Sequence, residues 1–237
     1  MVTLTYQERF KTDKGVFDEF TNRTLFELQS KGAFDDLVSP IQVGKESNVF
    51  IAKKGMQKMI VKIYRMQNCD FNTMYSYIRT DPRYAFLKKH RRQIIMAWTQ
   101  REYKNLLKAE KAGVRIPKPL DWRNHILIEE LIGNDDIPAP PLKDAQPENP
   151  TLFFKEIIKQ VKKLHKGGLV HGDLSSFNIL NHNEKPVLID FSQATVTTTP
   201  NWNELLQRDL NNICRYFAKC GIKEDSKRLF DEITKQE

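Results

Sequence analysis

The sequence predicts an α+β protein that folds as two lobes, and three observations support this class. Short β-branched runs separated by glycine-containing turns occupy residues 41–64, which is typical of a small antiparallel sheet. The second half of the chain instead carries apolar residues at helical intervals. Between them, residues 134–150 hold five prolines in 17 residues, which excludes a helix or a central strand and marks the expected connection between the lobes.

The first lobe begins with a predicted helix over residues 17–32, which ends at a glycine. The predicted sheet follows at 41–64, in the runs "IQVG", "NVFIAKKG" and "QKMIVKIY". Residues 65–95 are polar, aromatic and basic without a clean period, so we expect them to include a mobile loop. A helix is predicted over 94–112 and a buried strand over 125–133.

The second lobe is predicted to be mostly helical. Residues 151–168 place phenylalanine, isoleucine, valine and leucine at helical intervals and close on two glycines. "FNIL" and "PVLID" read as two short strands that turn at "NHNEKP". A last helix is predicted over 201–221, where Leu206, Leu210, Ile213 and Phe217 form a stripe.

Composition narrows the class of protein. Of the 237 residues, 40% are hydrophobic and 29% charged, so a buried core is expected. We find no apolar run long enough to span a membrane, no secretory h-region and only three dispersed cysteines, which favours a soluble cytoplasmic protein without structural zinc or disulfides. The formal net charge of +8 favours anionic partners such as nucleotides or RNA.

The stretch "HGDLSSFN" carries the strongest chemical signal. Asp173 on a turn can orient a hydroxyl or a water molecule and accept its proton, while Asn178 offers a hard oxygen ligand to Mg²⁺. Asp190 follows at the end of "PVLID" and can supply a second metal ligand. Taken alone, "HGD" is equally compatible with a capped bend, but the three residues at this spacing favour Mg²⁺-dependent phosphoryl transfer.

The predicted sheet offers complementary groups. Lys62 lies inside the apolar run "IVKIY", where it either reaches outward as an edge lysine or binds phosphate with an acidic partner. Glu102 on the next helix is the candidate partner, although a solvated surface glutamate fits the same charges. The turn "GKESN" (44–48) allows close backbone approach at Gly44, but it matches neither a Walker A loop nor G-x-G-x-x-G.

These residues together carry a family resemblance. "GKESNVF", "VKIYR", "REYKNL", "HGDLSSFNIL" and "LIDFSQ", with the opening "FDEFTNRTLFELQSKG", resemble the RIO family of atypical protein kinases, in the short archaeal-like form of its type-1 subfamily. The resemblance implies a two-lobed, trimmed protein-kinase-like fold with a small antiparallel sheet lobe and a mostly helical lobe. The implied parts are an N-terminal extension (1–38), an N-lobe (39–132), a hinge (133–150) and a C-lobe (151–237).

The resemblance also implies a role for each site residue. Asp173 would be the catalytic aspartate, Asn178 and Asp190 the metal ligands, and Asp190 also the position at which a phosphorylated intermediate is proposed in this family. Lys62, paired with Glu102, would hold the ATP phosphates. The phosphate-covering loop would comprise Gly44, Lys45, Ser47 and Asn48, and backbone groups of Glu130 and Ile132 would hold adenine, with residues 65–95 as the family's flexible loop.

Two positions depart from the pattern. Glu129 precedes the hinge where the family often has an apolar residue, which bears on the shape of the adenine pocket. Gly172 stands where ordinary protein kinases have the arginine that docks a phosphorylated activation loop, so control by that route is not expected.

The implied activity is that of a serine protein kinase that uses ATP with Mg²⁺, or Mn²⁺ as a substitute, autophosphorylates and hydrolyses ATP. The implied partners are a protein substrate or the chain itself, and the precursor of the small ribosomal subunit with its rRNA, whose maturation the kinase would serve.

Two other functions stay open from the sequence. A small-molecule phosphotransferase of the aminoglycoside or choline kinase type also uses an H-G-D-x-x-x-x-N loop. An ATP-gated RNA-binding module is favoured by the basic run 88–92 with nearby basic and aromatic residues, although a solvated positive face fits equally well. Those neighbours are Arg79, Arg83, Lys104, Tyr75, Tyr77 and Tyr84.

Overall fold

The computed structural model describes residues 17–67, 69–134 and 137–235, so residues 1–16 of the expected N-terminal extension lie outside the described part. The chain divides into two compact units. Unit 1 comprises the described residues as far as Arg79, with Tyr84–Tyr103 and Pro119–Leu131; unit 2 comprises Thr80–Arg83, Lys104–Lys118 and the chain from Ile132 onward. The predicted α+β class is confirmed. The boundaries expected after residues 38, 132 and 150 stay predictions.

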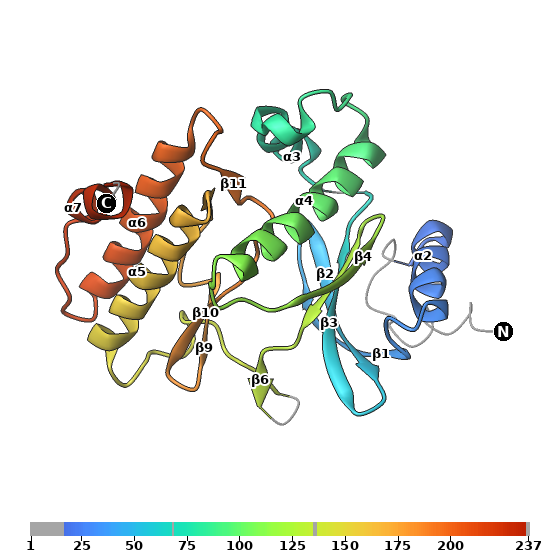
Figure 1. Ribbon diagram of the computed structural model, residues 1–237. Helices are drawn as coiled ribbons and strands as arrows, with labels where there is room; N and C mark the ends of the chain where they lie inside the picture. Colours follow the sequence, from blue (N-terminus) through green and yellow to red (C-terminus); the bar gives the residue numbers. More distant parts are fainter. Residues whose placement is uncertain (1–16, 68, 135–136, 236–237) are drawn as a thin grey trace. The chain divides into compact units, whose positions relative to one another are not determined.

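Unit 1 is built on a five-stranded antiparallel sheet in the order β1-β2-β3-β5-β4 (Figure 1). The strands are β1 (Asp36–Val43), β2 (Ser47–Lys54), β3 (Gln57–Tyr64), β4 (Pro119–Arg123) and β5 (Ile126–Glu130). The sheet predicted at 41–64 is therefore confirmed, but it starts earlier, at Asp36. Strand β4 was not predicted; it lies at the edge of the sheet beside β5, where the proline at its first position is tolerated.

The helix predicted over residues 17–32 is confirmed as α2 (Glu19–Ser30), and it covers one face of this sheet. The side chain of Asp18 caps its first turn by accepting from the Thr21 amide at 2.8 Å. Because side chains alternate along a strand, Val61 and Ile63 of β3 pack into the core beneath α2, whereas Lys62 between them faces the other side.

The other face of the sheet meets a second core formed with α3 (Phe71–Thr80) and α4 (Arg91–Lys111). This core contains Tyr64 of β3, Met74 and Ile78 of α3, and Ile94 and Trp98 of α4. The helix predicted over 94–112 is confirmed and begins three residues earlier than expected, since α4 starts at 91 rather than 94.

The prediction of a loop over residues 65–95 is wrong for much of that segment. It contains α3, a 3₁₀ turn at Pro82–Tyr84 and the start of α4. Met74 and Ile78 are buried four positions apart on one side of α3, and Asp70 accepts from the Thr73 amide at 3.0 Å at its start. Tyr75 and Tyr77 between these two apolar positions obscured the helical period.

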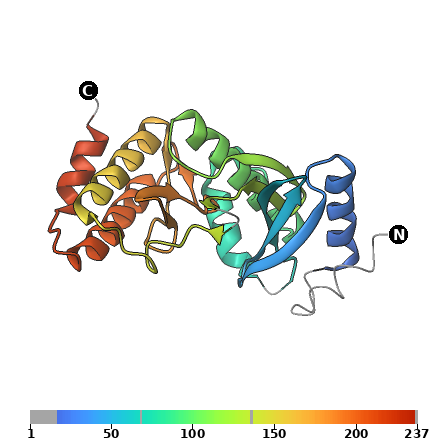
Figure 2. The ribbon, with the colours of Figure 1, turned by 90° about the horizontal axis from the view of Figure 1, so that it is seen from below.

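Unit 2 is held together by three helices that lie side by side (Figures 1 and 2). They are α5 (Pro150–Lys166), α6 (Trp202–Ala218) and α7 (Ser226–Thr234). The helices predicted over 151–168 and 201–221 are confirmed, whereas α7 was not predicted as a separate helix. Every helix of the described residues is too short or too polar to span a lipid bilayer.

Short strand pairs carry the loops of unit 2. They are β8 (Leu169–Val170) with β11 (Thr195–Val196), β9 (Ile179–His182) with β10 (Lys185–Leu188), and β6 (Gly133–Asn134) with β7 (Ile137–Pro138). The hairpin predicted at "NHNEKP" is confirmed, and Asn183 and Glu184 make its turn with φ of 52° and 59°. The proline-rich segment adds no central strand.

The strand pairs place the predicted site residues on loops. "HGDLSSFN" joins β8 to β9, and Asp190 follows the end of β10.

Candidate active site

In unit 1, Lys62 and Glu102 form the ion pair that the sequence predicted. The ammonium nitrogen of Lys62 lies 2.9 Å from Glu102 Oε1, and both residues are buried. The hydroxyl of Tyr64 donates to the other oxygen, Oε2. Burying two charges costs solvation energy that a pair alone does not always recover, so such a pair is weak evidence for stability and stronger evidence for a role in the site.

The turn 44–46 joins β1 to β2 as the sequence predicted. The Gly44 amide donates to the Ser47 carbonyl at 2.9 Å, and a Cβ atom at Gly44 would lie 2.8 Å from that oxygen, so only glycine fits. Lys45 is exposed and Ser47 half-buried. Both side chains can therefore be reached by a ligand at this turn.

Asn48 is not brought together with Lys62. Val49 lies opposite Lys62 in the ladder, whereas Asn48 lies opposite Ile63, on the α2 side of the sheet. Its side chain is buried, and both amide atoms lack a hydrogen-bond partner in the part of the chain that the structure describes. The role of Asn48 in the phosphate loop stays a prediction, and its side chain lies on the opposite face of the sheet from Lys62.

The two residues predicted to hold adenine differ in setting. Glu130 ends β5 and pairs with Met59 of β3. The Ile132 carbonyl already accepts from the Ala139 amide at 2.8 Å, which leaves the Ile132 amide as the group for a ligand. Glu129, the departure from the family pattern, lies opposite Ile60 and is half-buried.

In unit 2, the structure brings Asp173 and Asn178 together. The side-chain nitrogen of Asn178 donates to the Asp173 carbonyl at 2.8 Å and to its carboxylate at 3.1 Å. Gly172, with φ of +77°, turns the chain sharply before the aspartate. Because the amide nitrogen is engaged, the side-chain oxygen of Asn178 is the atom left to bind a metal.

Asp190 adopts a left-handed backbone conformation with φ of +61°. For a residue other than glycine this costs about 1–2 kcal/mol, and such strain persists where neighbouring contacts impose it. Burial, and then the nearby charge of Asp190, raise the pKa of the Asp173 carboxyl. The amide of Ile189 donates to the Asn178 carbonyl at 3.0 Å, so the chain leading into Asp190 lies beside the loop that carries Asp173 and Asn178.

Asp209 is a functional candidate that the sequence analysis missed. It lies on α6, is buried, and accepts from the amides of Gly172 and Leu174, each at 2.8 Å. Burial raises the pKa of its carboxyl to about 7, against the two hydrogen bonds that lower it. An aspartate beside Leu206 and Leu210 on the apolar stripe of α6 was the signal that could have identified it.

His171 and Arg208 also support the turn before Asp173. His171 Nε2 contacts the Ile189 carbonyl at 3.0 Å, and burial lowers the pKa of the ring to about 4, so it is neutral at pH 7. Arg208 donates to the Gly172 carbonyl. The backbone that carries Asp173 is thus held from several sides by buried polar groups.

The donor set fits Mg²⁺. Among the described residues no group of three or more His, Cys, Asp or Glu side chains is arranged to hold a metal. Magnesium commonly takes one or two carboxylates and completes its shell with water and phosphate oxygens. Asp190 and the amide oxygen of Asn178 match that chemistry, and no thiolate or imidazole cluster competes for a softer metal in the described part.

The basic run 88–92 is partly engaged within unit 1. The Lys89 ammonium lies 5.5 Å from the centre of the Tyr75 ring, and the Arg92 guanidinium lies 3.7 Å from that of Phe20. Arg83, which the sequence grouped with this run, instead pairs with buried Asp81 in unit 2 at 2.6 Å. The guanidinium of Arg83 is therefore engaged in contacts within unit 2, and we do not include Arg83 in the predicted RNA-binding surface.

Comparisons with known proteins identify the family. The profile described as RIO domain matches residues 48–230. The chain is 42% identical over 233 residues to the RIO-type serine/threonine-protein kinase Rio1 of Methanocaldococcus jannaschii, covering 98% of this chain and 80% of that protein. It is 37% identical over 231 residues to the protein of the same name from Haloferax volcanii, covering 97% and 80%.

A solved structure shares the fold. The Rio2 kinase-ADP/Mg²⁺-phosphoaspartate complex from Chaetomium thermophilum aligns with a TM-score of 0.69 at 20% identity, covering 91% of this chain and 66% of that chain. The likeness confirms the trimmed kinase fold that the sequence resemblance implied. The chain belongs to the RIO family of serine/threonine-protein kinases, as a member of its Rio1 type.

Proposed function

We propose that this chain is a serine protein kinase and ATPase that uses Mg²⁺-ATP and phosphorylates itself. The observation that carries the proposal is the contact of Asn178 with Asp173, at 2.8 and 3.1 Å, on the turn that Asp209 holds from beneath. This arrangement fixes a carboxylate beside an amide oxygen, which suits positioning an acceptor hydroxyl next to a metal-bound phosphate.

Asp173 orients the acceptor hydroxyl and accepts its proton. The hydrogen bond from Asn178 fixes the orientation of the partly buried Asp173 carboxylate. The hydroxyl of the phosphate acceptor therefore meets a proton acceptor that is already in position. Asp190 and the side-chain oxygen of Asn178 would hold Mg²⁺. When bound, this ion would neutralise negative charge on the phosphates. The phosphorylated aspartate named for the Chaetomium Rio2 complex makes Asp190 a candidate for such an intermediate here.

Lys62 binds the nucleotide phosphates, and Glu102 with Tyr64 keeps its ammonium in place. The turn around Gly44, with Lys45 and Ser47, covers the phosphates through backbone and side-chain donors. Backbone groups of Glu130 and Ile132 hold adenine.

The test is incubation with γ-labelled ATP and Mg²⁺, followed by location of the label by mass spectrometry. We expect label on serine together with free phosphate. Asp173→Asn should abolish turnover and retain ATP binding in calorimetry, because the amide cannot accept the hydroxyl proton. Label on choline or an aminoglycoside in preference to protein would favour the small-molecule phosphotransferase instead.

We further propose that the protein acts in the cytoplasm on the precursor of the small ribosomal subunit. The family membership and the net charge of +8 support an RNA-rich partner. Binding to small-subunit rRNA should weaken steeply with salt and fall when Arg91 and Arg92 are neutralised. Unchanged affinity in that double variant would remove the run 88–92 from the interface.

A further inference from the structure

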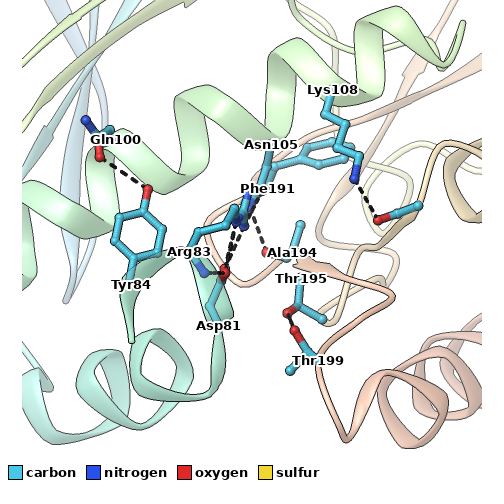
Figure 3. Close-up of polar contacts among 11 residues, drawn as sticks. Asp81, Arg83, Tyr84, Gln100, Asn105, Lys108, Phe191, Ala194, Thr195 and Thr199 are labelled. Atoms are coloured by element: carbon cyan, nitrogen blue, oxygen red, sulfur yellow. Dashed lines mark hydrogen bonds and ion pairs between the residues drawn. The ribbon is translucent and has the colours of Figure 1, made fainter. Parts of the chain in front are cut away.

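A buried polar network in unit 2 reaches the turn that carries Asp190. Asn105 of α4 donates through its side-chain nitrogen to the carbonyls of Phe191 and Ala194, at 3.1 and 2.7 Å (Figure 3). It is fully buried. Both hydrogens of the amide are thus used on the turn that follows Asp190, at its first and fourth residues.

The orientation of the Asn105 amide is fixed from its other side. Arg83 Nη2 donates to the Asn105 side-chain oxygen at 2.9 Å, and a guanidinium can only donate. The oxygen must therefore face Arg83, and the nitrogen must face the two carbonyls. The two carbonyls can only accept, so they require the same orientation, and Arg83 reinforces it from the opposite side.

Arg83 is itself held by Asp81. The carboxylate of Asp81 accepts from Arg83 Nε at 2.9 Å and from Nη2 at 2.6 Å, and it also accepts from the Arg83 amide at 3.0 Å. Asp81 is completely buried, and the side chain of Arg83 is 25% exposed. A two-pronged pair of this kind sets direction as well as distance.

The turn that Asn105 holds is strained and touches the catalytic loop. Asp190 has φ of +61°, and the Ala194 amide closes the turn on the Phe191 carbonyl at 3.1 Å. Gln193 of the same turn donates to the Asp173 carboxylate at 3.4 Å. Fixing the two carbonyls therefore constrains both the metal ligand and a neighbour of the catalytic aspartate.

We propose that Asn105, oriented by Arg83 and Asp81, is a positioning residue that holds Asp190 in its metal-binding conformation. The inference rests on the proposed function, because it takes Asp190 as the metal ligand. Asn105 acts through the backbone of the turn and does not itself touch metal or substrate.

The direct test is a titration with Mn²⁺ in the presence of ADP. Binding is measured as the decrease of the electron paramagnetic resonance signal that unbound Mn²⁺ gives. Asn105→Asp keeps the size of the side chain and the acceptor for Arg83, but it turns an oxygen toward the two carbonyls. We expect its dissociation constant for Mn²⁺ to rise about tenfold or more, as for other groups that orient metal ligands. Arg83→Lys keeps the positive charge but removes the planar guanidinium that contacts both Asp81 and Asn105. It should therefore raise the dissociation constant for Mn²⁺ by a smaller factor.

Ile233→Ala serves as the control, since it removes a buried side chain of α7 and destabilises unit 2 without touching the turn. Its Mn²⁺ affinity should stay within about twofold of wild type. If Asn105→Asp and Asn105→Ala bind Mn²⁺ as wild type does, or lose no more affinity than the control, the positioning role is overturned. Wild-type protein that takes up no Mn²⁺ with ADP would instead overturn the proposed metal site.

Discussion

At the scale of single residues, the pair of Lys62 and Glu102 connects stability with nucleotide binding. Replacing Lys62 by methionine should remove the cation from a buried carboxylate and lower the free energy of unfolding by about 3 kcal/mol. Adding Glu102→Gln should recover part of that loss, because the remaining charge is then removed as well. Urea unfolding of the three proteins measures both effects.

The same variants separate structure from binding. Both Lys62→Met and the double variant should bind ATP more weakly, since both lack the ammonium that is proposed to bind the phosphates. Lys54→Met, at the exposed end of β2, is the control and should change stability by no more than about 0.5 kcal/mol. A double variant that binds ATP as tightly as wild type would remove Lys62 from the nucleotide site.

Single residues also show what sequence reasoning can detect. Asp173, Asn178 and Lys62 were proposed because each stands at an unusual place: a polar pair on a short turn, or a charge inside an apolar strand. The structure contains the contacts of Asn178 with Asp173 and of Lys62 with Glu102, while the roles of these residues stay predictions. Asp209 was missed because it stands within a regular helical stripe, and its two amide partners are more than 30 positions away in sequence. Contacts at that separation leave no periodic signal.

At the scale of elements, long helices with a stripe and a cap were predicted well, whereas two-residue strands such as β8 and β11 were not. A strand of that length contains a single period, too little to reveal an alternation, and its partner is fixed by tertiary packing. Helix α3 was missed for another reason: its buried apolar positions are few and alternate with tyrosine, serine and asparagine side chains.

Helix α2 should respond to pH through His125. The ring of His125 contacts the Thr21 hydroxyl at 2.9 Å and stacks on Phe20, which also lies under Arg92. Burial lowers the pKa of His125 to about 4 from its ordinary 6.5, with Asp18 acting in the opposite direction. The folded chain therefore binds this proton less readily than the unfolded chain does.

The stability that neutral His125 contributes is complete above pH 6.5 and is lost as the pH falls toward 4, to a total of about 3 kcal/mol. His125→Gln, which keeps a polar side chain without titrating, should lose less stability than wild type between pH 7 and pH 5 in urea unfolding. His90→Gln, at an exposed histidine, is the control. Equal slopes for His125→Gln and wild type would contradict the expectation.

At the scale of the whole molecule, the proposed site residues are divided between two units, with Lys62 in one and Asp190 in the other. If one Mg²⁺-nucleotide engages both, hydrogen exchange should slow in β3 and in residues 172–178 and 190–194 together. The effect should require the metal as well as the nucleotide, because Asp190 and Asn178 act through Mg²⁺.

Hydrogen exchange with ADP alone, and with Mg²⁺ alone, provides the comparison. Asp190→Asn should abolish the added protection of residues 190–194 and weaken that of β3, since the metal no longer ties the phosphates to these residues. Protection confined to β3 in wild type with both ligands present would mean that the nucleotide does not use the acidic turn.

Helix α4 carries Glu102, which meets Lys62, and Asn105, which meets the Asp190 turn, three positions apart. Inserting one amino acid between them would swing either side chain by about 100° around the helix axis. Either contact can then be kept, but the two cannot be kept together without unwinding the helix. An engineered chain should therefore tolerate no insertion in this single turn.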